Sequence, residues 1–188
     1  TTLGYKSEVI KNYFTNYKNF SGNLSIDLNT GKVSYHNENC ENWKIHLLDT
    51  GKKTQTGGRI KQAMHFSNGK RIMATYGDAL ANVNIKKLLE FHKSHGKMVT
   101  LTAVRPPSRF GDVNIIDGKV VNFKEKSQTG KGWINGGYFV LEPEVVNYIS
   151  SNSTPFEEYP LQTLSKEGQL MAYKHQGFWQ PMDVIREK

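Results

Sequence analysis

Two aspartates, Asp78 and Asp183, each follow a largely apolar stretch of the chain. Asp78 comes after residues 71–77, which form a candidate strand ending in glycine, and Asp183 comes after residues 178–182. Ligands of open α/β sheets bind beyond the carboxyl ends of strands, so carboxylates arriving there could share Mg²⁺, a cation that prefers oxygen ligands. An aspartate after glycine is also typical of a turn or helix cap. The spacing alone does not bring the two residues together.

A polar, glycine-containing loop is expected over residues 49–58, followed by Arg59. Thr54 and Thr56 supply hydroxyls, and the paired glycines Gly57 and Gly58 would let backbone N–H groups approach a ligand closely. The Arg59 guanidinium offers a planar fork for phosphate or base carbonyls. The alternative is an ordinary Gly-Gly turn with a solvated arginine.

Two further segments could contact a ligand. Glu125 could accept hydrogen bonds from sugar hydroxyls while Lys126 neutralises a phosphate, although an exposed charged strand end would look the same. Asn135-Gly136-Gly137 lies in a strand-like run. Glycine inside a strand marks a place where another backbone or a ligand comes close, and both interpretations stay open.

Two histidines, His92 and His95, lie three residues apart on a predicted helix. That spacing can ligate zinc, but no acidic or cysteine partner accompanies them in the sequence. A position on the helix surface is therefore the favoured interpretation.

The elements expected to position these residues alternate between helix and strand. Strands over 71–76 and 98–104 flank a helix that Asn84 caps and Gly96 ends, which predicts parallel pairing of the two strands with a right-handed crossover. The alternation predicts an α/β fold with a mixed sheet. The other expected elements are a helix over 7–17, hairpins over 24–35 and 114–123, strands over 45–48, 134–141 and 170–175, a short helix over 143–149, and a helix opened by a capping box at 154–157 and closed at Gly168.

Composition limits the class of protein. The 188 residues suit one domain, and 37% hydrophobic residues suffice for a packed core. The formal net charge of +8 favours anionic partners, but no nucleic-acid-binding motif accompanies it. No apolar run approaches the roughly 18 residues of a membrane span. A single cysteine fits a reducing cytoplasm.

Taken in order, several motifs resemble those of the sugar nucleotidyltransferases, and within them the glucose-1-phosphate cytidylyltransferases. The resemblance runs from Gly4 to the C-terminus. The stretches that carry it are Gly4-Tyr5-Lys6, 41–44, Leu48-Asp49-Thr50-Gly51, Thr56-Gly57-Gly58-Arg59, Thr75-Tyr76-Gly77-Asp78, 101–107, 109–111, Phe123-Lys124-Glu125-Lys126, 133–141 and 177–183.

The resemblance implies a Rossmann-like, mixed and mostly parallel sheet with accessory β-hairpins, in a single domain over 1–188. It implies a cytoplasmic homo-oligomer that binds CTP and a sugar 1-phosphate, and no nucleic acid or membrane, in a pathway to surface polysaccharides such as O-antigen. By residue, it implies Asp78 and Asp183 as Mg²⁺ ligands, Thr54, Arg59 and Gly77 as nucleotide contacts, and Glu125, Lys126, Asn135 and Gly136 as sugar-phosphate contacts, with Asp78, Asp183 and Lys126 as catalytic residues.

The sequence also departs from the family pattern. Family members begin with a strand and a glycine-rich loop that carries Gly-Thr-Arg, followed by a Lys-Pro segment, and no such stretch precedes Gly4 here. We therefore expect an N-terminally truncated domain that is inactive on its own. Residues 79–82, residues 112–114 and Ser127 also differ from the pattern. Acceptor specificity resides in such loops, so a different phosphorylated acceptor, or an inactive homologue that only binds nucleotide, remains an alternative.

Overall fold

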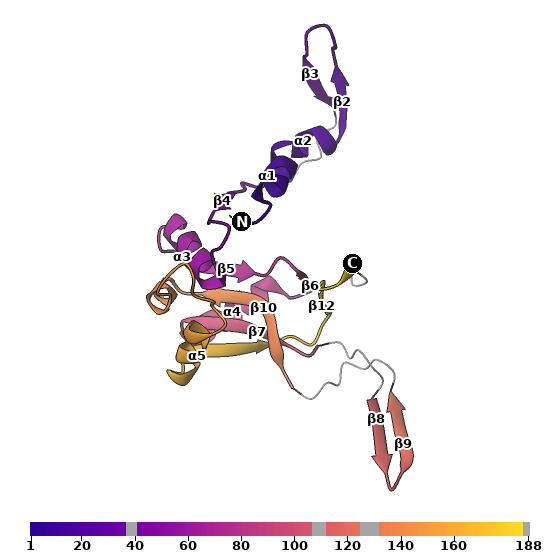
Figure 1. Ribbon diagram of the computed structural model, residues 1–188, viewed down its shortest axis with the longest axis vertical. Coiled ribbons are helices and arrows are strands. Elements are labelled where there is room, and N and C mark those ends of the chain that lie inside the picture. Colours follow the sequence, from indigo (N-terminus) through magenta and orange to yellow (C-terminus); the bar gives the residue numbers. More distant parts are fainter. Residues whose placement is uncertain (37–40, 107–111, 125–131, 186–188) are drawn as a thin grey trace.

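The computed structural model describes residues 1–36, 41–106, 112–124 and 132–185 (Figure 1). Its helices are α1 (Ser7–Thr15), α2 (Tyr17–Phe20), α3 (Thr56–Phe66), α4 (Ile85–His95), α5 (Tyr159–Lys166) and the 3₁₀ helix η1 (Pro143–Tyr148). Its strands are β1 (Thr2–Leu3), β2 (Asn23–Ile26), β3 (Val33–His36), β4 (Leu48–Asp49), β5 (Ile72–Thr75), β6 (Ala79–Ala81), β7 (Val99–Val104), β8 (Asp112–Ile116), β9 (Lys119–Lys124), β10 (Ile134–Leu141), β11 (Leu170–Lys174) and β12 (Trp179–Pro181). Among the helices described, none is both long and apolar enough to cross a membrane.

The main sheet has four strands in the order β11-β7-β10-β5. β11 pairs parallel with β7, whereas β10 pairs antiparallel with both β7 and β5. Three strands thus run in one direction and one runs against them, which confirms the expected α/β fold with a mixed sheet. The predicted direct pairing of 71–76 with 98–104 is wrong, because β10 lies between the two strands. Sheet order depends on contacts between distant segments, and both central strands, β7 and β10, are largely buried.

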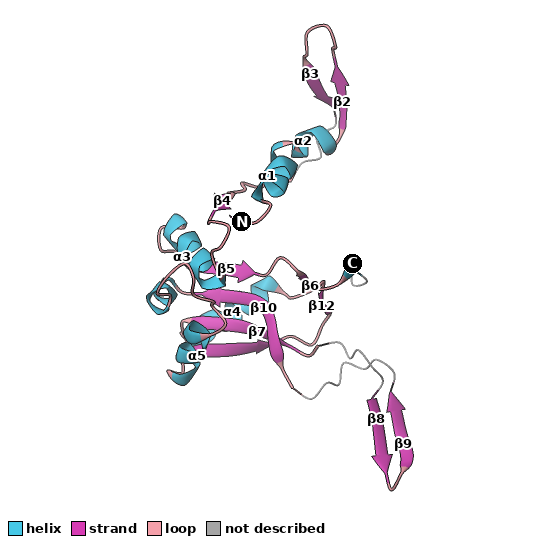
Figure 2. Ribbon diagram, viewed as in Figure 1, coloured by secondary structure: helices cyan, strands magenta, loops and turns pink. Residues whose placement is uncertain are grey.

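Helices cover both faces of this sheet (Figure 2). Phe139 and Leu141 of β10 pack in a cluster with residues of α3, η1 and α5. Val140, which points to the opposite face because side chains alternate along a strand, packs with Leu88 of α4. All three β10 side chains are at most 1% exposed, so this strand forms the centre of the core.

Several local predictions are confirmed. The Asn84 side chain accepts a hydrogen bond from the Lys87 amide at 3.0 Å, and Gly96 ends α4 in the left-handed conformation with φ 63°. Both hairpins form, β2 with β3 and β8 with β9. The hairpin of β2 and β3 continues an arm, residues 7–36, that rises away from the sheet in Figure 1.

Two local predictions are wrong. Residues 49–58 are not all loop, because α3 begins at Thr56. The capping box at 154–157 does not open a helix, and α5 starts only at Tyr159. Contacts with the core and with α3 fix residues 154–157 instead. Phe156 is fully buried, and its amide donates to Thr56 Oγ1 at 2.8 Å. Tertiary contacts here outweigh the local capping signal.

A chain of hydrogen bonds joins α4 to the sheet. The Lys97 amide donates to His95 Nδ1 at 2.9 Å, so His95 Nε2 carries the proton and donates to Thr100 Oγ1 at 2.7 Å. The Thr100 hydroxyl then donates to His92 Nδ1 at 2.8 Å, and His92 Nε2 lies 3.0 Å from the Glu142 carboxylate. The expectation that both histidines lie on the helix surface is wrong for His92, which is 1% exposed and has an acidic partner.

This chain of bonds predicts a loss of stability in mild acid. Burial, followed by the charges of His92 and Lys97, holds the pKa of His95 below its ordinary value of 6.5. A depressed histidine pKa means that the unfolded chain binds the proton more readily, so the stabilisation is complete above about pH 6.5 and is lost as pH falls below it. We expect a lower Tm at pH 5.5 than at pH 7.5, with a smaller drop in His95→Gln.

Ser94→Ala is the matched control, since it alters an exposed neighbour on α4 without removing a titrating group. Differential scanning calorimetry at the two pH values provides the measurement. A pH-dependent drop of equal size in His95→Gln and the wild type would contradict the assignment.

Candidate functional site

The pairing of two short strands brings Asp78 and Asp183 to one place. β6 and β12 run antiparallel, with Ala81 opposite Trp179 and Ala79 opposite Pro181. The pairing extends one residue beyond both strands, because the Met182 amide donates to the Asp78 carbonyl at 2.7 Å. Asp78 therefore lies opposite Met182, the residue before Asp183, so both aspartates are at the same end of the strand pair. Both aspartates are exposed.

A buried hydrogen bond fixes this strand pair to the main sheet. The Trp179 indole donates from Nε1 to the Gly136 carbonyl at 2.9 Å, and Trp179 is 9% exposed. A Cβ at Gly136 would lie 2.7 Å from Val104 Cγ1 and 3.0 Å from the Thr102 carbonyl. The glycine is thus required for close packing of β10 on β7, and its contact with a sugar phosphate stays a prediction.

Asn135 and Tyr76 connect β10 to the strand end that carries Asp78. The Asn135 side chain accepts from the Gly137 amide at 2.9 Å and donates to the Tyr76 hydroxyl at 3.3 Å. Gly137 has φ 77°, and a Cβ there would lie 2.4 Å from the Tyr76 ring, so only glycine fits. Tyr76 directly precedes Gly77 and Asp78, and the structure thereby brings Asn135, Gly136, Gly77 and both aspartates into one region.

Glu157, which sequence reasoning assigned to a helix cap, occupies a central position in this region. Its carboxylate accepts from Thr56 Oγ1 at 2.6 Å and from the Tyr76 hydroxyl. Burial first, and then the hydrogen bond to Glu157, raise the pKa of Tyr76 far above its ordinary value, so the hydroxyl stays a donor. No local pattern could have revealed these contacts, because the partners lie 81 and 101 residues away.

The predicted nucleotide loop has a different architecture from the one expected. Gly57 and Gly58 are buried in the first turn of α3, where a Cβ would lie 2.5 Å from the Thr154 carbonyl and 2.6 Å from Asn152 Cα, respectively. They form neither a ligand loop nor a Gly-Gly turn, and their small size lets the helix pack on the 152–156 segment.

Arg59 is half-buried rather than solvated. Its guanidinium donates to the Leu3 carbonyl at 2.8 Å, to Thr50 Oγ1 at 2.6 Å and to the Gly51 carbonyl at 3.3 Å. Thr54 Oγ1 donates to the Thr50 carbonyl at 2.5 Å. Arg59 and Thr54 thus gather around the carboxyl ends of the parallel pair β1 and β4, and their nucleotide contacts stay a prediction.

Two of the predicted sugar-phosphate contacts cannot be placed. Glu125 and Lys126 lie outside the described residues, as do 109–111 of the family pattern. The structure describes the hairpin of β8 and β9 as far as Lys124, the last residue of β9.

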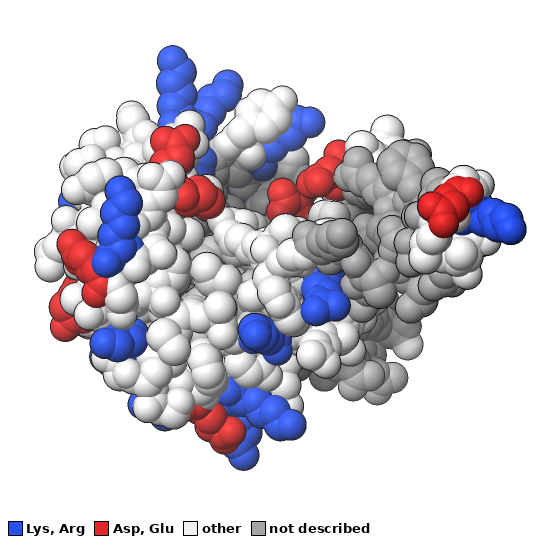
Figure 3. All heavy atoms as spheres, turned by 90° about the horizontal axis from the view of Figure 1, so that it is seen from below, with Lys and Arg blue, Asp and Glu red and all other residues white. Residues whose placement is uncertain are grey.

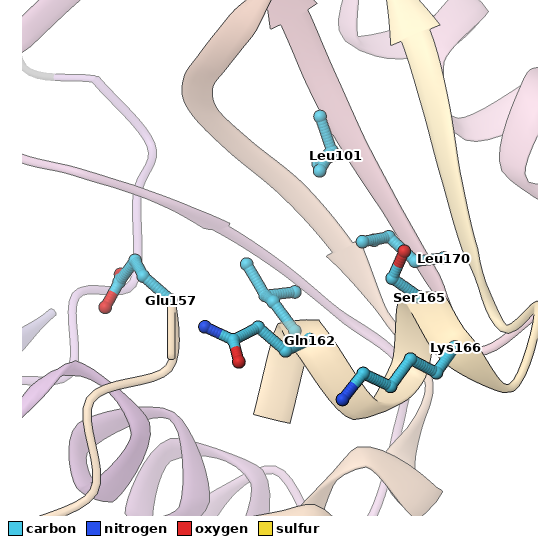
Figure 4. Close-up of a pocket in the computed structure, with 7 residues that line it drawn as sticks. Leu101, Glu157, Gln162, Ser165, Lys166 and Leu170 are labelled. Atoms are coloured by element: carbon cyan, nitrogen blue, oxygen red, sulfur yellow. The ribbon is translucent and has the colours of Figure 1, made fainter. Parts of the chain in front are cut away.

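A groove beside α5 borders this site only through Glu157. It has a volume of about 400 Å³ and lies between α5 and the sheet, lined by Leu101, Glu157, Leu161, Gln162, Ser165, Lys166 and Leu170 (Figure 4). Glu157 stands apart from Gln162 and Lys166 in this view, and its carboxylate is already engaged by Thr56 and Tyr76. Lys166 is the one cation among the residues that line the groove, and the one carboxylate there already accepts two hydrogen bonds. The groove therefore lacks the charged groups that a nucleotide or a sugar phosphate would need.

The two aspartates fit a magnesium ion. Mg²⁺ is held by one or two carboxylates together with water and substrate phosphates, and Asp78 and Asp183 supply two exposed carboxylates at one strand-pair end. Within the part of the chain that is described, no group of three or more His, Cys, Asp or Glu side chains is placed to hold a metal, so a cation at the two aspartates would need further ligands from water or substrate. The donor set therefore matches a cation shared with phosphates.

Comparison with known proteins shows the family of the chain. The sequence model of the nucleotidyl transferase family matches residues 5–184. The chain is 44% identical over 186 residues to the glucose-1-phosphate cytidylyltransferase of Salmonella typhimurium (strain LT2), with 98% of this chain and 72% of that protein covered. It is 34% identical over 121 residues to the mannose-1-phosphate guanyltransferase of Saccharomyces cerevisiae, covering 59% of this chain and 32% of that one.

Among solved structures, HddC from Yersinia pseudotuberculosis is similar in fold. The match has a TM-score of 0.63 at 20% identity and covers 99% of this chain and 73% of the HddC chain. The architecture built up above is therefore shared with a solved structure over nearly the whole length.

Proposed function

The chain belongs to the nucleotidyl transferase family, and we propose that it transfers a cytidylyl group from CTP to glucose 1-phosphate, giving CDP-glucose and pyrophosphate. The similarity to a glucose-1-phosphate cytidylyltransferase over nearly the whole chain carries this proposal. The convergence of Asp78 and Asp183 supports it. Transfer between two phosphate compounds needs a cation that neutralises their negative charge, and two carboxylates can hold such a cation.

The proposed reaction is a single in-line displacement. A phosphate oxygen of the sugar 1-phosphate attacks the α-phosphorus of CTP, and the bond from that phosphorus to the leaving pyrophosphate breaks. The nucleophile is already an anion, so no general base is required. When bound, Mg²⁺ supplies charge neutralisation at the phosphates.

The residues of the chain then bind and orient the two substrates. Asp78 and Asp183 hold the metal, Lys126 and Glu125 hold the sugar phosphate together with Asn135 and Gly136, and Thr54, Arg59 and Gly77 contact the nucleotide. Catalysis by such a set rests on positioning and electrostatics. The contacts of Tyr76 and Glu157 keep Asn135 and the strand end of Asp78 in a fixed relation.

The test is pyrophosphate release by the protein with its full natural sequence, given CTP, Mg²⁺ and glucose 1-phosphate. We expect Asp78→Asn and Asp183→Asn each to lower kcat by on the order of 10²-fold or more, because each removes one charged ligand. Asp117→Asn is the matched control: it removes a carboxylate from the turn of the β8–β9 hairpin, where asparagine tolerates the observed φ of 48°.

The outcome separates the candidate functions. Pyrophosphate release with another phosphorylated acceptor, and none with glucose 1-phosphate, would identify a cytidylyltransferase of different specificity. Binding of CTP without release for any acceptor would identify a nucleotide-binding homologue. Lys and Arg side chains are scattered over the face in Figure 3 and interspersed with acids, which does not favour a nucleic-acid-binding surface.

We also propose that the enzyme works in the cytoplasm, where it supplies CDP-sugars for surface polysaccharides such as O-antigen. The single cysteine fits a reducing compartment, and the product named above is an activated sugar. Accumulation of the labelled CDP-sugar in the cytoplasmic fraction of cells would support this location.

Self-association is proposed from the arm, residues 7–36. Helix α1 has no buried residue, and an apolar surface of this extent on a soluble protein marks an interaction site. Large apolar side chains exposed along the arm are Val9, Ile10, Tyr13, Phe20, Ile26, Leu28 and Val33. We expect light scattering to give a multiple of the chain mass, and Tyr13→Ser with Phe20→Ser to reduce it. A monomeric wild-type protein at micromolar concentration would contradict the proposal.

A further inference from the structure

Two cations and an indole meet at the edge of the main sheet where β7 and β11 end. Arg105 directly follows β7, Lys174 is the last residue of β11, and Trp133 directly precedes β10. The register places Ile134 opposite Val104 and Lys174 opposite Ala103. Trp133 and Arg105 are therefore the next pair along the β10–β7 ladder, at the carboxyl edge where open α/β sheets bind ligands.

Both cations lie within contact distance of the same aromatic ring. The Arg105 Cζ atom is 5.1 Å from the Trp133 ring centroid, and the Lys174 Nζ atom is 5.6 Å from it. A cation within about 6 Å of an indole is attracted to it, so the half-buried Trp133 contacts two like charges. Such an arrangement raises the local potential and attracts an anion.

The described part of the chain shows no ion pair at either of these cations. The ion pairs between described side chains involve Lys11 with Asp49, and Arg71 and His92 with Glu142. Neither Arg105 nor Lys174 has a carboxylate partner within that part of the chain. The protein thus maintains two cations without a described counter-charge at the ligand-binding edge of its sheet.

A small pocket opens beside them. It has a volume of about 240 Å³ and is lined by Arg105, Trp133, His175, Gln176 and Gly177. His175 Nε2 donates to the Phe178 carbonyl at 3.1 Å, which fixes the ring. A Cβ at Gly177 would lie 2.4 Å from Asn82 Oδ1 and 2.7 Å from His175 Cε1. The glycine therefore keeps the wall of the pocket compact.

The pocket adjoins the elements of the candidate site. Trp133 is two residues before Asn135, and Gly177 is two residues before Trp179, the first residue of the strand that leads to Asp183. The pocket and the two aspartates are therefore approached by the same pair of chain segments. Its volume is below the range of typical ligand pockets, and suits a phosphate with part of a sugar rather than a nucleoside triphosphate.

We propose that Arg105, with Lys174 and Trp133 beside it, forms a second phosphate contact, which binds the phosphoryl group of the sugar 1-phosphate together with the contact proposed for Lys126. The planar guanidinium binds two phosphate oxygens at once, and the lysine adds a point charge. Trp133 is a positioning residue, because its ring contacts both cations, of which Arg105 lines the pocket. The identity of the substrate rests on the function proposed above, whereas the anion-binding role rests on the geometry.

Isothermal titration calorimetry tests this second phosphate contact without turnover. The protein with its full natural sequence is titrated with glucose 1-phosphate in EDTA, with and without saturating CTP. Arg105→Gln should raise Kd for glucose 1-phosphate by about 10-fold or more, since it removes charge-assisted hydrogen bonds to the phosphate, and Lys174→Gln should raise it several-fold. Lys93→Gln, an exposed lysine on α4, is the matched control and should leave Kd unchanged.

Further arms identify the source of the phosphate. The Arg105 and Lys174 variants should weaken the binding of glucose 1-phosphate. They should leave Kd for CTP and for pyrophosphate within about twofold of the wild-type value. Trp133→Phe, which keeps an aromatic ring, should retain more affinity than Trp133→Ala. Equal melting temperatures of all variants would show that they fold.

Two results would overturn the proposal: wild-type affinity for glucose 1-phosphate in both cation variants, or a loss confined to pyrophosphate or CTP. No binding of glucose 1-phosphate to the wild type, with or without CTP, would overturn it as well. The function proposed above fails separately. If the sugar phosphate binds in an Arg105-dependent way but no pyrophosphate is released with CTP and Mg²⁺, the second phosphate contact stands and the cytidylyl transfer does not.

Discussion

The antiparallel pairing of β6 with β12 is the constraint on which the functional interpretation depends. Asp78 and Asp183 are separated by more than half of the chain, and only this pairing makes them neighbours. The pair has three residues in each strand and is extended by the bond from the Met182 amide to the Asp78 carbonyl. So short a pair is not stable alone, and its position depends on the buried bond from the Trp179 indole to Gly136. The position of the two aspartates is therefore linked to the core around β10.

Polar contacts, rather than apolar packing alone, connect the parts of the site. Glu157 joins the first residue of α3 to Tyr76, and Tyr76 in turn accepts from Asn135. A partly buried carboxylate is costly unless its oxygens are paired, and here each oxygen has a hydroxyl donor. The arrangement fixes the distance between the start of α3 and the strand end at Gly77 and Asp78, as positioning catalysis requires.

Much of the fold could be predicted from the sequence, because its signals are local. Helix α4 follows from the cap at Asn84 and the terminator at Gly96, and β10 from the apolar run 134–141. The insertion of β10 between β5 and β7 could not be predicted, because sheet order depends on contacts between distant segments. For the same reason the capping-box pattern was misleading at Thr154: burial of Phe156 and the bond to Thr56 decided its conformation.

The candidate site shows the same division. That Asp78 and Asp183 lie at strand ends follows from the sequence, whereas their meeting required the structure. Gly57, Gly58 and Gly136 were recognised as places of close approach, and the neighbours proved to be protein atoms in each case. Arg105 and Lys174 gave no signal, since only the register of three strands brings them to one indole.

Crystallographic location of a bound metal tests the central claim most directly. The protein with its full natural sequence would be crystallised with Mn²⁺ in place of Mg²⁺, together with CTP, and the metal found from its anomalous scattering. The structure predicts a single Mn²⁺ with oxygen ligands from both Asp78 and Asp183 and from the nucleotide phosphates. A metal held by only one of these aspartates, or bound at a distance from both, would contradict the account.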